Sequence, residues 1–420
     1  MRIIKSITLQ VSFILISLFS FSAYADQELF QAVRGGNLER VETLLGGAGK
    51  RLPDAVVNEQ DGQKKTALHW ATADAHLSSD IAKALLAAGA DPNMRDNHGW
   101  TPVNWALNYN RDDLVLLLGE FGADMDAAYE DGRTLLHHAW SDLDKTKLFI
   151  QAGADVNVVD AHGWKALHYA ILNGQLEVAQ ELISAGTDVN GTDIYGFTPF
   201  HLAFFSGNDH AADLLVKAGA DVNALDPHGN PILNIAVMRG LAGEVKALIG
   251  FAPAADANAL DAQGYTPLTG ALRMGRLDIA QILIDAGADV NLEDGHGVTP
   301  LYLASMYGYS DLVDSILGAG ADADFSDTDG NNSLHKAAFY GYSDITVSLL
   351  KSGADPFLKN MSKETPLKTA KLQRKGTSQG MAMDPELEER APYWEYLEVV
   401  KLLRKDMRAK TFDRVMKNKR

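Results

Sequence analysis

The chain has 420 residues, with 38 basic and 55 acidic side chains, a formal net charge of −17 and no cysteine. The lack of cysteine excludes a disulfide framework, a cysteine-ligated zinc ion, thiol catalysis and an iron–sulfur cluster. The acidic balance argues against nonspecific nucleic-acid binding, because that binding needs Lys and Arg to displace counterions from phosphates.

The first 25 residues have the pattern of a secretory signal peptide. Two basic residues precede an almost wholly apolar run over 7–21, and residues 23–25 read Ala-Tyr-Ala. We therefore predict cleavage between Ala25 and Asp26. The alternative is an uncleaved membrane anchor, for which the apolar run is short. A short signal of this kind is typical of bacteria, so we expect a periplasmic or secreted protein with no stable membrane insertion after cleavage.

The rest of the chain repeats itself about every 33 residues. Thr-Pro-Leu-His or a variant opens each repeat, and Gly-Ala-Asp-x-Asn closes it, as at 266–268 and 287–291. One column of the repeat recurs in steps of 31 to 35 residues at His69, Asn104, His137, His168, His201, Asn234, Thr269, Tyr302, His335 and Lys368. Nine consecutive steps of this size indicate a tandem repeat and not separate globular domains.

This pattern resembles the ankyrin repeat, with its Thr-Pro-Leu-His opening and its Gly-Ala-Asp-x-Asn end. The resemblance covers 26–405 and implies an all-α solenoid of helix-turn-helix repeats with short β-hairpin tips. We count about eleven repeats, with boundaries near 61, 96, 130, 160, 193, 226, 261, 294, 327 and 360. The last repeat carries an insertion over 373–393, and a basic C-terminal tail follows over 406–420. In this family the hairpins and first helices line the concave side, where partners usually bind.

The residues of one repeat explain its expected shape. In the repeat from Gly264 to Asp294, Thr266 is a good helix N-cap and Pro267 suits the first helical position. Gly275 ends this first helix, and the apolar residues of 279–284 form the stripe of a second helix. Because one repeat cannot bury its apolar face alone, the stacked repeats must share a continuous core.

Twelve histidines raise the question of a metal site. In the resembled family the opening-motif imidazole makes hydrogen bonds between repeats, which accounts for His69, His137, His168, His201 and His335. Four others lie at the tips of alternate repeats in the pattern Asp-x-His-Gly, at His98, His162, His228 and His296. Such tips are about 20 Å apart if the helix layers stack about 10 Å apart, so one metal ion cannot bridge them. We interpret these histidines as turn residues, with a partner contact or a metal as alternatives.

Two further features were weighed for chemistry. The acidic run at Asp322, Asp324, Asp327 and Asp329 resembles a calcium loop, but Phe325 takes a ligand position and no Glu closes the loop. The chain contains no Gly-x-Ser-x-Gly, phosphate loop or dinucleotide fingerprint, and no stretch between repeats is long enough for a catalytic domain. We therefore predict no catalytic residues, no metal, no cofactor and no enzymatic activity.

Large side chains occur at positions that such repeats leave exposed, either before Thr-Pro or beside the Gly that follows the first helix. Tyr and Trp are favoured at interfaces because they offer rigid area with a polar tip. We predict that a partner binds Trp100, Trp164, Phe197, Met274, Tyr307, Tyr309, Tyr340 and Tyr342. The alternative is that these rings pack on neighbouring repeats or are covered by flanking hairpins.

Charge divides the chain unevenly. Residues 361–420 carry a net charge of +6 and the signal segment +2, which leaves −25 on residues 26–360. A negative field of this size favours a basic protein partner and speeds its capture. The basic end is expected to cap the last repeat, with binding to anionic phospholipid or peptidoglycan as the alternative.

The leading prediction for function is a noncatalytic, exported, monomeric scaffold that binds another protein through its concave face. A periplasmic immunity or inhibitor protein that neutralises a toxin is one alternative. A secreted effector that binds host proteins is another. A role in protection against peroxide rests on the family resemblance alone.

Overall fold

The computed structural model describes residues 27–46, 57–74, 76–251, 254–378 and 393–417. The predicted signal segment 1–25 and the cleavage point between Ala25 and Asp26 lie outside these residues, as does most of the predicted insertion. The chain divides into two compact units, Met1–Ala218 and Gly219–Arg420, which we call the N-terminal unit and the C-terminal unit.

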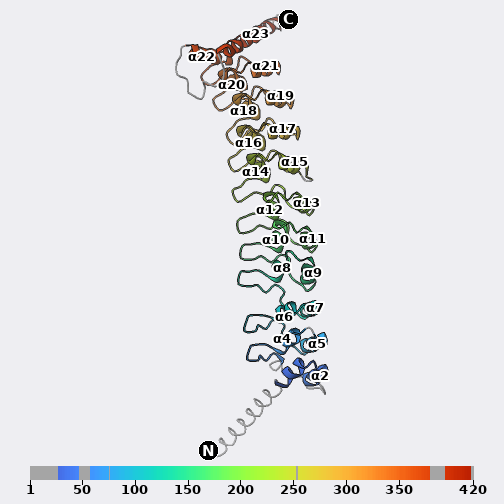
Figure 1. The fold of residues 1–420 in the computed structure, drawn as a ribbon. Coiled ribbons are helices and arrows are strands. Elements are labelled where there is room, and N and C mark those ends of the chain that lie inside the picture. Colours follow the sequence, from blue (N-terminus) through green and yellow to red (C-terminus); the bar gives the residue numbers. More distant parts are fainter. Residues whose placement is uncertain (1–26, 47–56, 75, 252–253, 379–392, 418–420) are drawn as a thin grey trace, which may run out of the picture. The chain divides into compact units, whose positions relative to one another are not determined.

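The N-terminal unit is a stack of helix pairs in sequence order (Figure 1). After a helical stretch over 27–34, the first helices of the pairs are α4 (Ala67–Thr72), α6 (Pro102–Asn108), α8 (Leu135–His138), α10 (Ala166–Leu172) and α12 (Pro199–Phe205). The second helices are α2 (Leu38–Gly46), α5 (Ser79–Ala87), α7 (Asp112–Glu120), α9 (Leu143–Gln151), α11 (Leu176–Ser184) and α13 (Asp209–Lys217). First helices pack on first helices, as α4 does on α6, and second helices pack on second helices, as α5 does on α7.

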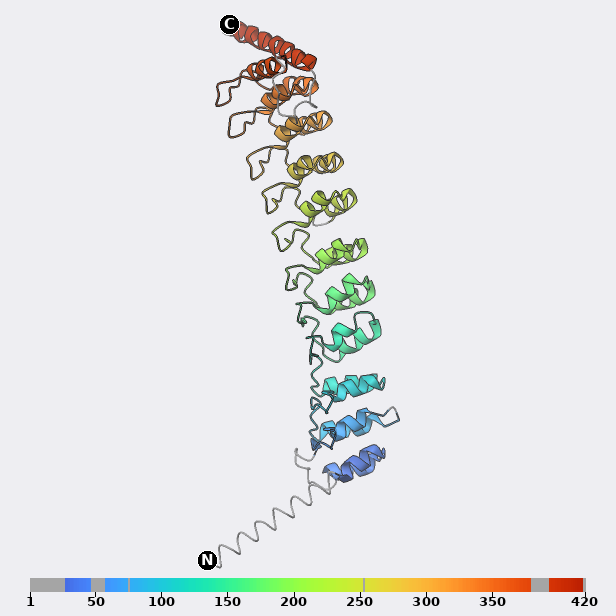
Figure 2. The same ribbon diagram turned by 60° about the vertical axis from the view of Figure 1, so that its left-hand side comes forward.

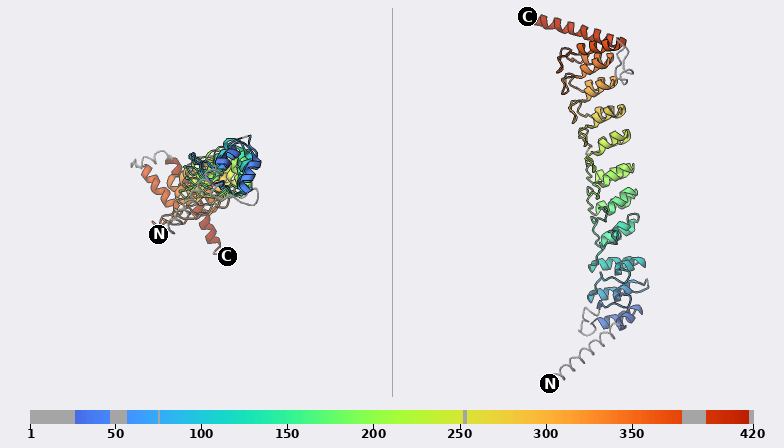
Figure 3. Two further views of the ribbon diagram at one scale, coloured as in Figure 1. Left: turned by 90° about the horizontal axis from the view of Figure 1, so that it is seen from below. Right: turned by 90° about the vertical axis from the view of Figure 1, so that its left-hand side faces the viewer.

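The C-terminal unit repeats the same arrangement. Its first helices are α14 (Ile232–Arg239), α16 (Pro267–Arg273), α18 (Pro300–Tyr307), α20 (Ser333–Tyr340) and α22 (Pro366–Ser378). Its second helices are α15 (Ala242–Gly250), α17 (Leu277–Asp285), α19 (Ser310–Gly318), α21 (Ser343–Lys351) and α23 (Tyr393–Lys417). Because α23 packs on both α22 and α21, it forms the last layer of this unit (Figure 3).

The C-terminal elements differ in extent from the sequence-based expectation. Helix α22 continues to Ser378, past residue 373 where the insertion was expected to begin. Helix α23 runs through residue 405 without a break, so the basic residues after it do not form a separate tail. Its sequence contains neither Gly nor Pro, and Lys and Arg are good helix formers, which explains why the helix does not stop there.

The core of each unit lies between the helix pairs. Leu167 and Ile171 of α10 and Leu182 of α11 are completely buried, as are the matching residues of other pairs. As predicted, a glycine ends the first helix: Gly308 after α18 and Gly341 after α20 have the left-handed conformation that only glycine adopts at low cost.

Asparagine side chains tie neighbouring repeats together behind the tips. The Oδ1 atom of Asn93 accepts the N–H of Asp124 at 2.7 Å, and its Nδ2 donates to the Gly122 carbonyl at 3.1 Å. Asn291 makes the same two bonds with the repeat that follows it. The Asn that closes each Gly-Ala-Asp-x-Asn motif is thus an inter-repeat clamp, and its two bonds fix the distance between successive layers.

The loops between helix pairs are tight turns with very little β-structure (Figure 2). In the part of the chain that is described, β-type pairing is limited to the single bridges Leu225–Pro231 and Ser326–Asn332. A typical tip is closed by two backbone bonds, from Asp96 N–H to the Trp100 carbonyl at 2.9 Å and from Gly99 N–H to the Asp96 carbonyl at 3.0 Å. The expected β-hairpins are therefore reduced to their turns. None of the helices in the described ranges is both long and apolar enough to cross a bilayer.

Candidate interaction surface

An aspartate organises most of the tips. The Oδ1 atom of Asp160 accepts the N–H groups of His162 at 2.8 Å and Trp164 at 3.0 Å, and so closes an Asx turn. The same pair of bonds recurs in six other tips, at Asp96, Asp193, Asp226, Asp261, Asp294 and Asp327. These carboxylates are committed to the backbone of their own tips, so they shape the surface and do not serve as free ligands.

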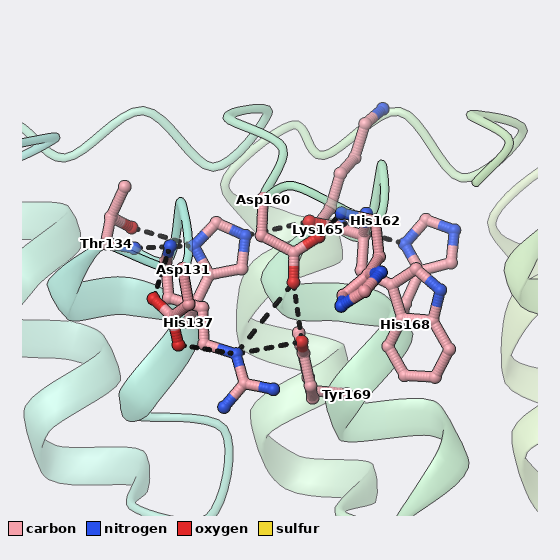
Figure 4. Close-up of polar contacts among 10 residues, drawn as sticks. Asp131, Thr134, His137, Asp160, His162, Lys165, His168 and Tyr169 are labelled. Carbon is pink, nitrogen blue, oxygen red and sulfur yellow. Dashed lines mark hydrogen bonds and ion pairs between the residues drawn. The ribbon is translucent and has the colours of Figure 1, made fainter. Parts of the chain in front are cut away.

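The second oxygen of several tip aspartates holds the first helix in place. The Tyr169 hydroxyl of α10 donates to Asp160 Oδ2 at 2.6 Å (Figure 4) and accepts a bond from Arg133 Nε at 3.0 Å. The indole N–H groups of Trp70 and Trp105 bind Asp61 and Asp96 in the same way.

These contacts shift the pKa values of both partners in the Asp160 cluster. Burial alone would raise the pKa of Asp160, but the bonds from Tyr169 and from two backbone N–H groups hold it below its usual value. The pKa of Tyr169 rises to about 12, because burial and the neighbouring carboxylate disfavour the phenolate. The cluster is therefore an ionised, hydrogen-bonded joint between two repeats at neutral pH.

The histidines of the opening motif join neighbouring repeats, which confirms the prediction made from the family resemblance. His69 Nδ1 accepts the N–H of Thr66 at 3.0 Å, and its Nε2 lies 3.1 Å from the Trp100 carbonyl of the next repeat. His137 repeats this geometry (Figure 4), as does His335. A ring that accepts at Nδ1 must carry its proton on Nε2 and be neutral. Burial accordingly lowers the pKa of these rings, and lowers that of His168 to about 4.

Cations of the chain itself cover several aromatic rings near the tips of the N-terminal unit. The guanidinium of Arg34 lies 3.6 Å from the centre of the Trp70 ring. Lys65 Nζ lies between Trp70 and Trp105, at 4.6 and 3.9 Å from their ring centres. The stacking of cations and rings stabilises the surface, and it makes those ring faces unavailable to a partner.

The three ring residues that the sequence placed before Thr-Pro lie in the tip region of the N-terminal unit. Trp100 is 37% exposed and meets Trp105 edge to face, with ring centres 5.6 Å apart. Trp164 is half-buried, and its indole N–H donates to Asp193 at 3.2 Å. Phe197 is half-buried too and packs against neighbouring rings. Each ring is anchored at its base and presents only part of its area to solvent.

The four tyrosines predicted to bind a partner lie in the C-terminal unit, at the other end of the first helices. The rings pair as Tyr307–Tyr309 and Tyr340–Tyr342, with centres 5.7 and 5.9 Å apart, and all four are half-buried. A Cβ atom at Gly308 would lie 2.8 Å from the Tyr342 ring, so this ring packs directly on the turn of the preceding repeat.

The packing of these tyrosines is the alternative that the sequence analysis left open, although each ring also keeps some solvent contact. The neighbouring Met274 is 55% exposed. The turns that carry these residues lie one helix length, or about 12 Å, from the tips of the same repeats. The eight predicted residues therefore do not form one site.

The structure exposes two residues that the sequence analysis did not single out. Ile194 and Tyr195 are 60% and 62% exposed at the tip that begins with Asp193, and Val159 is 48% exposed in the preceding tip. A signal for them existed in the sequence. The two middle residues of the Asp-x-x-Gly turn must face solvent, so a large apolar pair at those positions is not explained by folding.

Metal binding finds no support in this geometry. The tip histidines His98, His162, His228 and His296 are exposed and separate from one another. Within the described ranges, no group of three or more His, Asp or Glu side chains is arranged to hold a metal ion. The acidic run is used internally, since Asp322 and Asp327 accept backbone N–H groups of their own turns.

Comparison with known proteins supplies the family. A family model of ankyrin repeats, built of three copies, matches residues 29–129, 108–193, 139–226, 200–294 and 287–360. The neurogenic locus notch homolog protein 1 of Mus musculus is 38% identical over 125 residues, which are 29% of this chain and 5% of that protein. A glycerophosphocholine phosphodiesterase of Schizosaccharomyces pombe is 27% identical over 166 residues, which are 37% of this chain and 14% of that protein.

A solved structure is also similar. The crystal structure of the ankyrin repeat domain of Bcl-3, a member of the IkappaB protein family, aligns with a TM-score of 0.46 and 27% identity, covering 58% of this chain and 99% of that one. The chain spans only a small part of the curated relatives that it matches. The matches to the repeat model, in contrast, extend over most of the chain, from residue 29 to residue 360. The chain therefore belongs to the ankyrin repeat family, whose repeats form scaffolds for binding other proteins.

Proposed function

We propose that the protein is a noncatalytic, exported scaffold that binds another protein at the tip side of its N-terminal unit. The observation that carries this proposal is the exposed apolar pair Ile194–Tyr195. The fold does not need large apolar residues there, because the matching positions of the preceding tip hold Ala161 and His162.

The pair is held in a fixed position before any partner arrives. The Ile194 N–H donates to the His162 carbonyl of the preceding tip at 3.0 Å, and the Tyr195 N–H donates to Asp193 Oδ1 at 2.9 Å. A pre-ordered tyrosine loses little conformational freedom on binding, and this lowers the cost of association. Aromatic residues in such positions are frequent hot spots of interfaces.

The sequence supports the other parts of the proposal. The signal pattern favours the periplasm or the exterior as the place of action. The charge of −25 over residues 26–360 favours a basic partner, whose capture would be fast and would weaken with salt. We propose that the protein acts as a monomer, since one scaffold of this length offers each partner a separate tip surface.

A photo-crosslinker placed at Tyr195 in the cells that produce the protein tests the proposal. The matched control is the same crosslinker at Leu172, which is 43% exposed on the same unit but lies at the far end of α10. We expect a discrete protein adduct from position 195, absent from position 172 and reduced at 0.5 M salt. Equal adducts from both positions, or none from position 195, would contradict the proposed surface.

Two further measurements complete the test. A Tyr307→Ala/Tyr340→Ala variant should leave the adduct at position 195 intact, because those rings belong to the C-terminal unit. Cell fractionation with sequencing of the mature N-terminus tests export, which requires a chain beginning at Asp26 outside the cytoplasm. A full-length chain that stays in the cytoplasm would exclude the exported role.

A further inference from the structure

One step between neighbouring tips of the N-terminal unit is irregular. At the place where most tips have their aspartate, the tip 129–132 has Tyr129. Elsewhere in this unit a backbone bond joins successive tips, as from Asn97 N–H to the Gln63 carbonyl and from Ile194 N–H to the His162 carbonyl, both at 3.0 Å. Among the described contacts, no such bond joins the tips 96–99 and 129–132.

The side-chain bond between repeats is also redirected at this step. Asn104 occupies the column in which His69 and His137 reach a backbone carbonyl of the next repeat. Its Nδ2 atom instead donates to the Tyr129 hydroxyl at 3.1 Å. The two tips are thus held apart by a side chain, where a backbone bond would draw them together.

A cavity of about 250 Å³ opens between these two tips. The residues that matter for its chemistry are Trp100, Tyr129, Asn104, Arg95, Asp124 and Glu130. Trp100 and Tyr129 are 37% and 44% exposed, so both rings can be reached from solvent. The volume suits one long side chain and is too small for a helix or a folded loop.

The rings of this cavity differ from their neighbours in one respect. Trp70, Trp105 and Tyr169 each carry a Lys or Arg of this chain over the ring. No described cation lies over Trp100 or Tyr129, and the Trp100 indole N–H has no hydrogen-bond partner among the described residues. The same stacking chemistry that fills the other rings is therefore vacant at this one place.

The charges around the cavity favour a cation. Asp124 and Glu130 are exposed carboxylates on its lining, against the single guanidinium of Arg95. Arg95 Nη1 is engaged with the Gly99 carbonyl of its own tip at 3.3 Å. The excess of negative charge over residues 26–360 draws a positive group toward this surface and repels a carboxylate.

We propose that this cavity receives a lysine or arginine side chain of the partner protein, with the cation over the Trp100 and Tyr129 rings and near Glu130. The site rests on the proposed scaffold function and gives it a point of recognition. The apolar pair at 194–195 supplies contact area two tips further along the same unit, so the partner segment would carry a basic residue next to an apolar surface.

The test uses the mature protein and three capped tripeptides, acetyl-Gly-Arg-Gly-amide, acetyl-Gly-Gln-Gly-amide and acetyl-Gly-Glu-Gly-amide. The readout is the indole ¹⁵N–¹H signal of Trp100 in NMR titrations, assigned with Trp100→Phe. We expect saturable shifts with the arginine peptide and none with the glutamine or glutamate peptides. Glu130→Gln should weaken the arginine peptide by roughly fivefold, which is the size of a cation contact worth about 1 kcal/mol.

Arg95→Gln is the decisive control, because Arg95 opposes a cation and would assist an anion. This variant should bind the arginine peptide as tightly as the parent protein or more tightly. Loss of binding in Arg95→Gln, a preference for the glutamate peptide, or no shift with any peptide would each overturn the proposal. Because the crosslink from position 195 is a separate readout, it can persist when this site fails, and the two proposals can be rejected independently.

Discussion

Replacing His168 by asparagine should remove a defined part of the protein's sensitivity to acid. The imidazole is completely buried, and its Nδ1 accepts the N–H of Lys165 at 3.0 Å. A protonated ring cannot accept that bond, so the folded state needs the neutral form. Burial, the largest cause, lowers the pKa of His168 from its usual value near 6.5 to about 4.

The size of the effect follows from linkage between protonation and folding. Between the folded pKa near 4 and the unfolded pKa near 6.5 the unfolded chain binds more protons, so the folded state loses stability as the pH falls. The full loss for one such ring is about 3 kcal/mol, reached near pH 4, and about 2 kcal/mol is already lost at pH 5. Above pH 7 the contribution is complete.

Asparagine is the informative replacement because this chain already uses it in the same column. Asn104 Oδ1 accepts the N–H of Thr101 at 3.0 Å, as the histidine Nδ1 does. Asn234 Nδ2 donates to the Tyr265 carbonyl of the next repeat at 3.1 Å, as the histidine Nε2 does. His168→Asn should therefore keep both connections at neutral pH while it removes the titrating group.

The assay is urea unfolding of the parent protein and of His168→Asn at pH 7.5 and pH 5.0, with hydrogen exchange of the α10 amides as the local readout. The parent should lose about 2 kcal/mol more than the variant between these pH values. Aspartates with lowered pKa, such as Asp160, titrate below this window and do not contribute. An unchanged pH dependence in the variant would refute the account of the buried neutral ring.

Three stability predictions follow from contacts between and within repeats. Asn93→Ala removes both inter-repeat bonds and should cost about 1–2 kcal/mol in urea unfolding, whereas Asn93→Asp keeps the acceptor and should cost about half as much; equal costs would argue against the clamp. Lys64 has a φ of 58°, so Lys64→Gly should stabilise by about 1 kcal/mol, while Lys83→Gly inside α5 should destabilise by about the same amount. Tyr169→Phe leaves Asp160 Oδ2 without its closest donor and should cost about 1–3 kcal/mol by thermal or urea unfolding; a neutral result would show that Arg133 alone satisfies the carboxylate.

Much of the architecture could be predicted from the sequence because it depends on contacts that recur within a short stretch. The N-cap and the opening-motif side chain are three residues apart, as with Thr66 and His69. The glycine after each first helix takes a conformation that other residues avoid, as Gly308 does. Interactions of this range are written in the local sequence, and their repetition about every 33 residues makes them visible.

The extent of the last helices was less predictable. The break in the repeat pattern after Gln373 was interpreted as an insertion, and the basic residues after 405 as a tail. Both segments lack strong stop signals at those points, so helix formation continues past them. A departure from the repeat is not in itself a helix end.

The accessibility of side chains on the tip surface was decided by the tertiary structure. Tyr169 is covered by Arg133, which is 36 residues away in the preceding repeat, while Trp100 keeps an open face because its neighbour across the step is Tyr129. The sequence by itself determined the repeat, the helix pairs and the histidine joints, since these follow from local rules. Only the stacking of repeats decided which rings are covered and which remain open, because exposure depends on residues about 30 positions away whose identity no local pattern contains.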